Sequence, residues 1–205
     1  MKHVPNAITI VRILFAPVFI ALLLGAGADI ESPLRWWGAG LFIVGMATDG
    51  IDGWLARRFN AVSDFGKLMD PIADKVLTGG ALIALSILGE LPWWVTAIIL
   101  VREVGITVWR MVELNVNVVV AASWAGKVKT VFQFLAISSA LLPLSPLVGD
   151  WYNTLNVVLM TIATLATLAS GLDYVVSALR SKRASRTIPA ARPTRVSSSK
   201  TTTRG

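Results

Sequence analysis

Residues 36–57 read WWGAGLFIVGMATDGIDGWLAR, an apolar run that ends in two aspartates and an arginine. A helix of this length crosses the roughly 30 Å hydrocarbon core of a bilayer. Runs of similar length and composition recur at 7–28, 68–89, 92–112, 124–143 and 152–179. Backbone polar groups in lipid must be satisfied within the segment, which favours helices for runs of this length. The sequence therefore predicts an all-α integral membrane protein with six transmembrane helices.

The composition agrees with a membrane protein. Of the 205 residues, 55% are hydrophobic and only 15% are charged, and the mean hydropathy is +0.67. These values exclude a soluble globular domain and a disordered chain. The chain has no cysteine, which also excludes a disulfide-stapled module and thiolate metal sites.

The positive charge is concentrated at the C-terminus. The formal net charge is +7, but residues 180–205 hold eight Lys or Arg and no Asp or Glu, so the other 179 residues are nearly neutral. This distribution argues against nucleic acid as a partner. We expect a membrane domain over 1–179 and a disordered, basic, cytosolic tail over 180–205, which either stays solvated or binds anionic lipid head groups.

Basic residues also predict the orientation in the membrane. With six spans both termini share one side, and most of the Lys and Arg outside the spans lie on that side, which places it in the cytosol. The first run resembles a signal peptide, but Arg12 interrupts it and we expect it to be retained. A multi-pass location in the plasma membrane follows, with its site facing the cytosol.

Two pairs of aspartates lie near the cytosolic ends of the second and third runs. Asp49 and Asp52 are three residues apart, and Asp70 and Asp74 are four apart, so each pair shares one helix face. In an antiparallel hairpin the two pairs meet at similar depth. Four intramembrane carboxylates cost about 10–14 kcal/mol without a partner on the insertion scale.

Divalent cations would offset that cost. Oxygen ligands without a nearby His or Cys suit Mg²⁺ or Mn²⁺, and two ions bridged by the four carboxylates would polarise a phosphoryl group. Gly50, Gly53 and Ala56 leave a groove beside them, and Arg57 at its mouth suits a phosphate oxygen. The alternative for the small residues is close helix packing.

Four basic residues in or beside the fourth and fifth runs suggest a second anion site. Intramembrane cations usually face a site or a partner, although those near a span end can also extend to the interface. A cationic pocket suits an acceptor that carries its own phosphate. We expect an acceptor-phosphate site at Arg102, Arg110, Lys127 and Lys129, with Glu103 shaping the pocket.

The acidic hairpin also carries a longer motif, D-x2-D-G-x2-A-R-x8-G-x3-D-x3-D, matched at Asp49, Asp52, Gly53, Ala56, Arg57, Gly66, Asp70 and Asp74. This motif resembles the defining one of the CDP-alcohol phosphatidyltransferases. The resemblance extends to VPNAITIVRILFAPVF at 4–19, WWVTAIILVREVGITVWR at 93–110 and AASWAGKVKTVFQFLAI at 121–137. These stretches resemble the branch that transfers a phosphatidyl group from CDP-diacylglycerol to sn-glycerol 3-phosphate, with release of CMP. The resemblance covers about residues 4–180.

The resemblance implies a role for each matched residue. Asp49, Asp52 and Asp70 resemble metal ligands, and Asp74 resembles the catalytic base and is also expected to share a metal. Contacts to CDP-diacylglycerol are implied for Asn6, Thr9, Gly53, Ala56, Arg57, Ser63 and Gly66. The resemblance also implies a homodimer among membrane lipids. It leaves open direct displacement or a covalent intermediate.

Two alternatives stay open from the sequence. One is a member of the same family with another acceptor, either phosphatidylglycerol, which would give cardiolipin, or inositol phosphate. The more distant one is a divalent-cation transporter that uses the aspartates as its transport site. The position of the aspartates near the cytosolic side rather than at the midplane favours phosphate chemistry.

Overall fold

The computed structural model describes the backbone of residues 4–58, 64–114 and 124–187, and the side chains of 13–48, 72–109, 126 and 128–177. All secondary structure in these ranges is helical. The helices are α1 (Val4–Ala26), α2 (Pro33–Arg58), α3 (Asp64–Ile87), α4 (Trp93–Leu114), α5 (Trp124–Leu141), α6 (Ser145–Val148) and α7 (Trp151–Thr187). Six long helices therefore coincide with the six predicted apolar runs. The short α6 lies between the last two of these runs.

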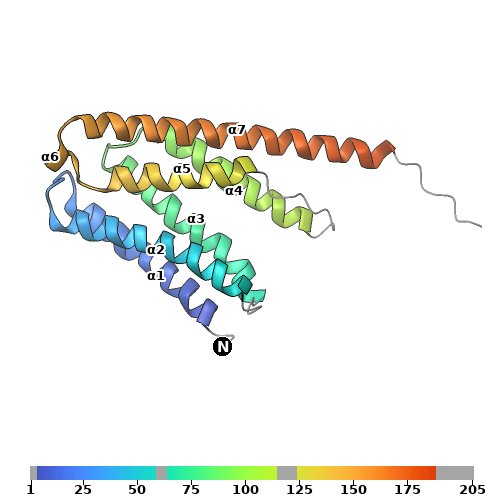
Figure 1. Ribbon diagram of the computed structural model, residues 1–205, viewed down its shortest axis with the longest axis horizontal. Coiled ribbons are helices and arrows are strands. Elements are labelled where there is room, and N and C mark those ends of the chain that lie inside the picture. Colours follow the sequence, from blue (N-terminus) through green and yellow to red (C-terminus); the bar gives the residue numbers. More distant parts are fainter. Residues whose placement is uncertain (1–3, 59–63, 115–123, 188–205) are drawn as a thin grey trace, which may run out of the picture.

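The helices run back and forth as one bundle (Figure 1). The most extensive contacts join α1 to α2, α5 to α7, and α1 to α3. The start of α1 and the end of α7 lie toward the same end of the bundle, whereas α6 lies at the other. The C-terminal ends of α2 and α4 and the N-terminal ends of α3 and α5 lie toward the end that holds the start of α1 (Figure 1).

Small residues and aromatic rings hold the first three helices together. A Cβ on Gly38 of α2 would lie 2.9 Å from Leu23 Cγ of α1, and one on Gly80 of α3 would lie 2.6 Å from Ile20 Cδ1. Such close approach is typical of helices packed in membranes. Phe19 and Phe42 pack edge to face in this core, with ring centroids 5.8 Å apart.

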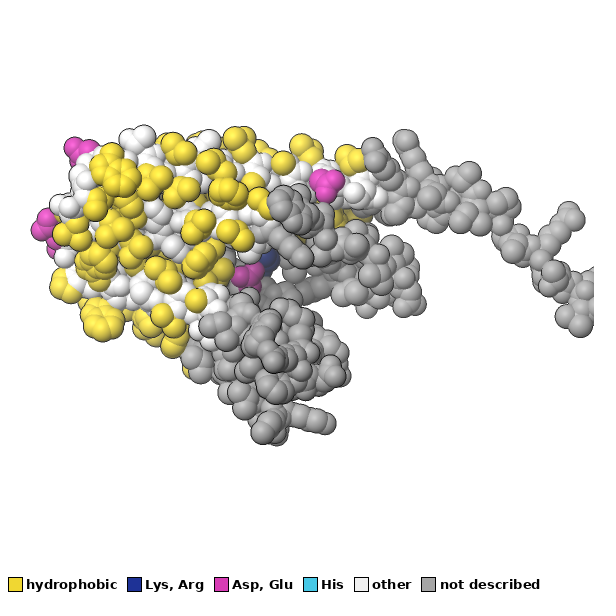
Figure 2. All heavy atoms as spheres, in the orientation of Figure 1, with side chains coloured by type: hydrophobic (Ala, Val, Ile, Leu, Met, Phe, Trp, Pro, Cys, Tyr) yellow, Lys and Arg dark blue, Asp and Glu magenta, His cyan; other side chains and the backbone are white. Residues whose placement is uncertain are grey.

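The outer surface is apolar. Hydrophobic side chains cover most of the described surface in Figure 2, and acidic side chains gather at the end that carries α6. Val101 is 73% exposed and Trp37 is 69% exposed. An apolar surface of this extent is costly in water and suits contact with lipid.

The prediction of six spans is confirmed only as six long helices. Among the described residues, one helix is both long and apolar enough to cross a bilayer, Trp151–Ser177 with a mean hydropathy of 1.8. The apolar segments Ile13–Ala26 and Val128–Leu141 are shorter. Charged groups within α3 and α4, which build the site described below, lower the apolarity of those two helices.

The last helix continues beyond the predicted end of the membrane domain. We placed the start of the disordered tail at 180, but α7 extends to Thr187. The first eight residues of the predicted tail are therefore helical, because Arg, Lys and Ala favour a helix whether or not they lie in lipid. Residues 188–205 lie outside the described ranges.

Candidate active site

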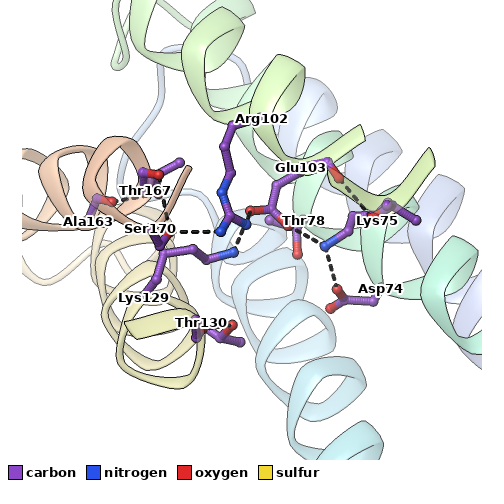
Figure 3. Close-up of polar contacts among 12 residues, drawn as sticks. Asp74, Lys75, Thr78, Arg102, Glu103, Lys129, Thr130, Ala163, Thr167 and Ser170 are labelled. Carbon is purple, nitrogen blue, oxygen red and sulfur yellow. Dashed lines mark hydrogen bonds and ion pairs between the residues drawn. The ribbon is translucent and has the colours of Figure 1, made fainter. Parts of the chain in front are cut away.

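A buried glutamate organises the polar centre of the bundle. Glu103 of α4 is 4% exposed, and its carboxylate accepts hydrogen bonds from three cations on three helices. Lys75 comes from α3, Lys129 from α5, and Arg102 is the neighbour of Glu103 on α4 (Figure 3). Arg102 Nη1 lies 2.9 Å from Glu103 Oε1. Three positive side chains thus converge on one carboxylate inside the bundle.

Asp74 lies at the edge of this centre. Lys75 Nζ is 3.2 Å from Asp74 Oδ2 and also donates to Glu103, so one ammonium group bridges the two carboxylates. The Asp74 side chain is 28% exposed, whereas the Glu103 side chain is 5% exposed. Asp74 is therefore the carboxylate of this centre that a substrate can reach.

Arg102 joins α4 to α7. Its Nη2 donates to Ser170 Oγ at 2.7 Å, and that hydroxyl donates in turn to Thr167 O at 3.2 Å. Gly171 makes room for the guanidinium stem, since a Cβ there would lie 3.3 Å from Arg102 Cγ. Arg102 is thus held by both α7 and Glu103, which fixes the position of its charge.

The charges of the centre do not balance. Three cations, Lys75, Arg102 and Lys129, face the two carboxylates Asp74 and Glu103, an excess of one positive charge among the described side chains. An excess charge away from water is costly unless an anion compensates for it. Within the described side chains, positive charge exceeds negative charge beside Asp74; this count does not include Asp49, Asp52 and Asp70, whose side chains lie outside that set.

A small cavity of about 20 Å³ opens between these groups. Asp74, Lys75, Glu103, Lys129 and Gln133 all line it. A much larger cavity of about 500 Å³ lies at the α6 end, with a mainly apolar lining that includes Leu85, Val95 and Met160. That larger cavity contains none of the predicted site residues, so we assign the site by its chemistry rather than by cavity size.

The structure tests only some of the predicted site residues. It brings the side chains of Asp74, Arg102, Glu103 and Lys129 together, which places the predicted base beside three residues of the predicted acceptor site; their functional roles stay predictions. The side chains of the other candidates lie outside the described ranges, and so does the backbone of Ser63; these candidates are Asn6, Thr9, Asp49, Asp52, Gly53, Ala56, Arg57, Ser63, Gly66, Asp70, Arg110 and Lys127. Their roles remain predictions.

The backbone supports the predicted metal ligands in one respect. Both aspartate pairs lie within helices, Asp49 and Asp52 on α2 and Asp70 and Asp74 on α3, so each pair does share a helix face. The two helices also contact one another. Among the described side chains no group of three or more potential ligands occurs, since three of these four aspartates lie outside that set. The oxygen-only donor set fits Mg²⁺ or Mn²⁺.

Sequence reasoning missed three residues of the site. Lys75 directly follows Asp74. A lysine within a predicted membrane span is unusual, and for that reason it could have been predicted as a site residue. Gln133 lies four residues after Lys129 and therefore shares its helix face. Its position beside Lys129 could thus also have been predicted from the sequence. Ser170 carried no signal, because its partner Arg102 is 68 residues away.

Comparison with known proteins gives consistent matches. The CDP-alcohol phosphatidyltransferase family model matches residues 2–169. A protein of Mycobacterium tuberculosis, named probable phosphatidylglycerophosphate synthase, is 44% identical over 182 residues, which cover 88% of this chain and 83% of the relative. Proteins named CDP-diacylglycerol–glycerol-3-phosphate 3-phosphatidyltransferase are 36% identical in Bacillus subtilis and 35% identical in Escherichia coli. These two alignments cover 85% and 86% of this chain and 94% of each relative.

Proposed function

The chain belongs to the CDP-alcohol phosphatidyltransferase family, and we propose that it transfers a phosphatidyl group from CDP-diacylglycerol to sn-glycerol 3-phosphate. The products are phosphatidylglycerophosphate and CMP, so the enzyme acts in phospholipid biosynthesis. One observation carries the choice of acceptor. The excess of positive charge around Glu103, beside Asp74, suits an acceptor that brings its own phosphate.

The proposed reaction is a displacement at phosphorus. Asp74 accepts the proton of the acceptor hydroxyl while that oxygen forms a bond to the β-phosphorus of CDP-diacylglycerol. The bond from this phosphorus to the bridging oxygen breaks, and its electron pair leaves with CMP. Asp74 suits this role because its carboxylate is partly exposed and its neighbour Lys75 holds it beside the anion site.

Divalent cations complete the donor site. Asp49, Asp52 and Asp70, together with Asp74, would hold two Mg²⁺ or Mn²⁺ ions, because four carboxylates exceed the needs of one ion. When bound, such ions neutralise charge on the diphosphate. Asn6, Thr9, Gly53, Ala56, Arg57, Ser63 and Gly66 would contact CDP-diacylglycerol.

The acceptor site uses cations that are already held in place. Glu103 fixes Lys129 and Arg102 before the substrate arrives, and preorganised charges of this kind stabilise a bound phosphate without further rearrangement. Arg110 and Lys127 would complete the site. Serine, choline and ethanolamine bring no phosphate for these cations, which disfavours them as acceptors.

The proposal includes a membrane topology. The six long helices α1–α5 and α7 would span the plasma membrane, with both termini and the active site on the cytosolic side. The apolar outer surface supports lipid contact for the bundle. We also propose a homodimer, and a basic tail that remains cytosolic.

The test is an acceptor assay on the purified full-length protein. With CDP-diacylglycerol and Mg²⁺, we expect CMP release when glycerol 3-phosphate is supplied and none with phosphatidylglycerol or inositol phosphate. Asp74→Asn serves as the control for contaminating activity. CMP release with another acceptor but not with glycerol 3-phosphate would reject the assignment within the family.

A further inference from the structure

A buried glutamine in the small cavity has a carbonyl oxygen without a hydrogen-bond partner. Gln133 of α5 is 3% exposed, and its Oε1 has no partner among the described residues. Buried polar atoms are nearly always hydrogen-bonded, so an unpaired one needs an explanation. This oxygen belongs to a side chain that lines the same cavity as Asp74, Lys75, Glu103 and Lys129.

Two hydroxyls line the cavity with Gln133, but both donate elsewhere: Thr78 to Met46 Sδ and Thr130 to the Gly126 carbonyl. Phe42, Met46 and Ile137 form the apolar part of the cavity lining. The cations nearby are engaged with Glu103, and an amide oxygen accepts a hydrogen bond rather than binding an anion. The group that fits beside Gln133 is therefore a neutral donor, such as a hydroxyl.

The size of the cavity agrees with a hydroxyl. A volume of about 20 Å³ is close to what one water molecule or one hydroxyl needs. It is too small for a whole glycerol phosphate. The rest of the acceptor would lie at the cations while a single hydroxyl enters the cavity.

The spacing along α5 matches an acceptor of this length. Gln133 follows Lys129 by four residues, so both face the same side, about 6 Å apart along the helix. A glycerol phosphate with its phosphate at Lys129 can place a hydroxyl one turn away. It has two hydroxyls, and the primary one is the less hindered nucleophile. The secondary hydroxyl is left to be bound.

We propose that Gln133 binds the secondary hydroxyl of glycerol 3-phosphate and thereby selects this acceptor over phosphates that lack that group. The inference rests on the proposed function and adds the residue that recognises the glycerol part of the acceptor. With its oxygen toward the cavity, the amide accepts the hydrogen bond that the hydroxyl donates. Sites built to bind a substrate hydroxyl reject the analogue that lacks it.

The test crosses two enzymes with two acceptors. The enzymes are the wild type and Gln133→Met, which keeps the side-chain length and removes the amide. The acceptors are glycerol 3-phosphate and 3-hydroxypropyl phosphate, which lacks only the secondary hydroxyl. We expect the wild type to prefer glycerol 3-phosphate by about 100-fold in kcat/KM and Gln133→Met to prefer it by less than about fivefold. If Gln133→Met does not fold, Gln133→Asn, which withdraws the amide by one methylene, is compared in the same way.

The matched control is Ser138→Ala on the same helix. Ser138 is also buried, and its Oγ also has no partner among the described residues, but it does not line this cavity. Ser138→Ala should keep the full preference. The inference is overturned if Gln133→Met keeps the wild-type preference, as it would if Gln133 held only a water molecule, or if Ser138→Ala loses it equally. No activity of the wild type with glycerol 3-phosphate would instead reject the proposed function and this inference together.

Discussion

The bundle pairs a carboxylate with basic side chains at its α6 end and again at its polar centre, but in different proportions; the Glu90 side chain at the α6 end is 28% exposed, whereas Glu103 is buried. At the α6 end, the Glu90 carboxylate accepts hydrogen bonds from both terminal nitrogens of Arg35. Arg35 is 2% exposed. At the polar centre of the bundle, Glu103 accepts hydrogen bonds from Lys75, Arg102 and Lys129. The first is a one-to-one ion pair whose charges cancel. In the second, the described cations outnumber the described carboxylates.

This difference separates a structural ion pair from a binding site. The Arg35–Glu90 pair ties the start of α2 to the turn between α3 and α4, and its two charges compensate each other. The Glu103 cluster gains from an additional anion, because its cations outnumber its carboxylates. From the stoichiometry within the described side chains, we propose a binding role for the Glu103 cluster and a packing role for the Arg35–Glu90 pair.

The largest effect on activity is expected from a substitution of Asp74. We expect no substitution at the α6 end to reduce activity as much. Asp74→Asn removes the proposed base while it keeps the shape of the side chain. We expect kcat to fall by about 10³-fold, within the range for general base catalysis, with little change in Tm. CMP release and thermal unfolding measured on the same preparation check this, and retention of more than a tenth of the activity would remove Asp74 from the base role.

The next largest effect is expected at Glu103, where the loss of one carboxylate leaves three cations without their common partner. Glu103→Gln should lower the free energy of unfolding by about 3 kcal/mol, as loss of one member of a buried ion pair does. Activity should fall by about 100-fold because Lys129 and Arg102 lose their fixed positions. Thermal unfolding and steady-state kinetics are the measurements, and an unchanged Tm would contradict the view of Glu103 as the organiser.

A smaller effect is expected at Lys75, which bridges Asp74 and Glu103. Lys75→Met should reduce kcat/KM by about tenfold, a loss of ~1.4 kcal/mol in transition-state stabilisation, because it removes only the link between the two carboxylates. Kinetics with each substrate varied in turn provide the measurement. A loss as large as that of Asp74→Asn would mean that Lys75 itself contacts the substrates.

The smallest effect is expected from replacing the whole ion pair at the α6 end. The double variant Arg35→Met, Glu90→Met should keep kcat/KM within about threefold and the Tm near that of the wild type, since apolar replacement of a buried ion pair is often neutral. The single variant Glu90→Met, which leaves the buried Arg35 unpaired, should be clearly less stable. Loss of activity in a stable double variant would break the comparison between the α6 end and the polar centre.

The sequence was sufficient for the helices and for part of the site, for physical reasons that differ by residue. Runs of about 20 apolar residues leave few alternatives to a helix, so the six long helices were predictable. Asp74 and Lys129 were found because a charge inside such a run is conspicuous. Arg102 and Glu103 were found on the same ground.

Other features depend on three-dimensional packing or on local helix preference. The contact between Arg102 and Ser170 depends on how α4 and α7 cross, which periodicity does not specify. The role of Glu103 as the common partner of three cations needed the positions of α3 and α5 relative to α4. The extension of α7 to Thr187 follows from helix propensity, whereas the predicted end at 179 followed hydropathy.

The most direct test of the central claim is the KM of Lys129→Met for each substrate. Lys129 is 4% exposed, contacts Glu103 and lines the site cavity. Loss of a hydrogen bond to a charged group should raise the KM for glycerol 3-phosphate by about 10- to 100-fold, while the KM for CDP-diacylglycerol stays unchanged. A rise in both KM values, or in that for CDP-diacylglycerol alone, would contradict an acceptor-phosphate site at the Glu103 cluster.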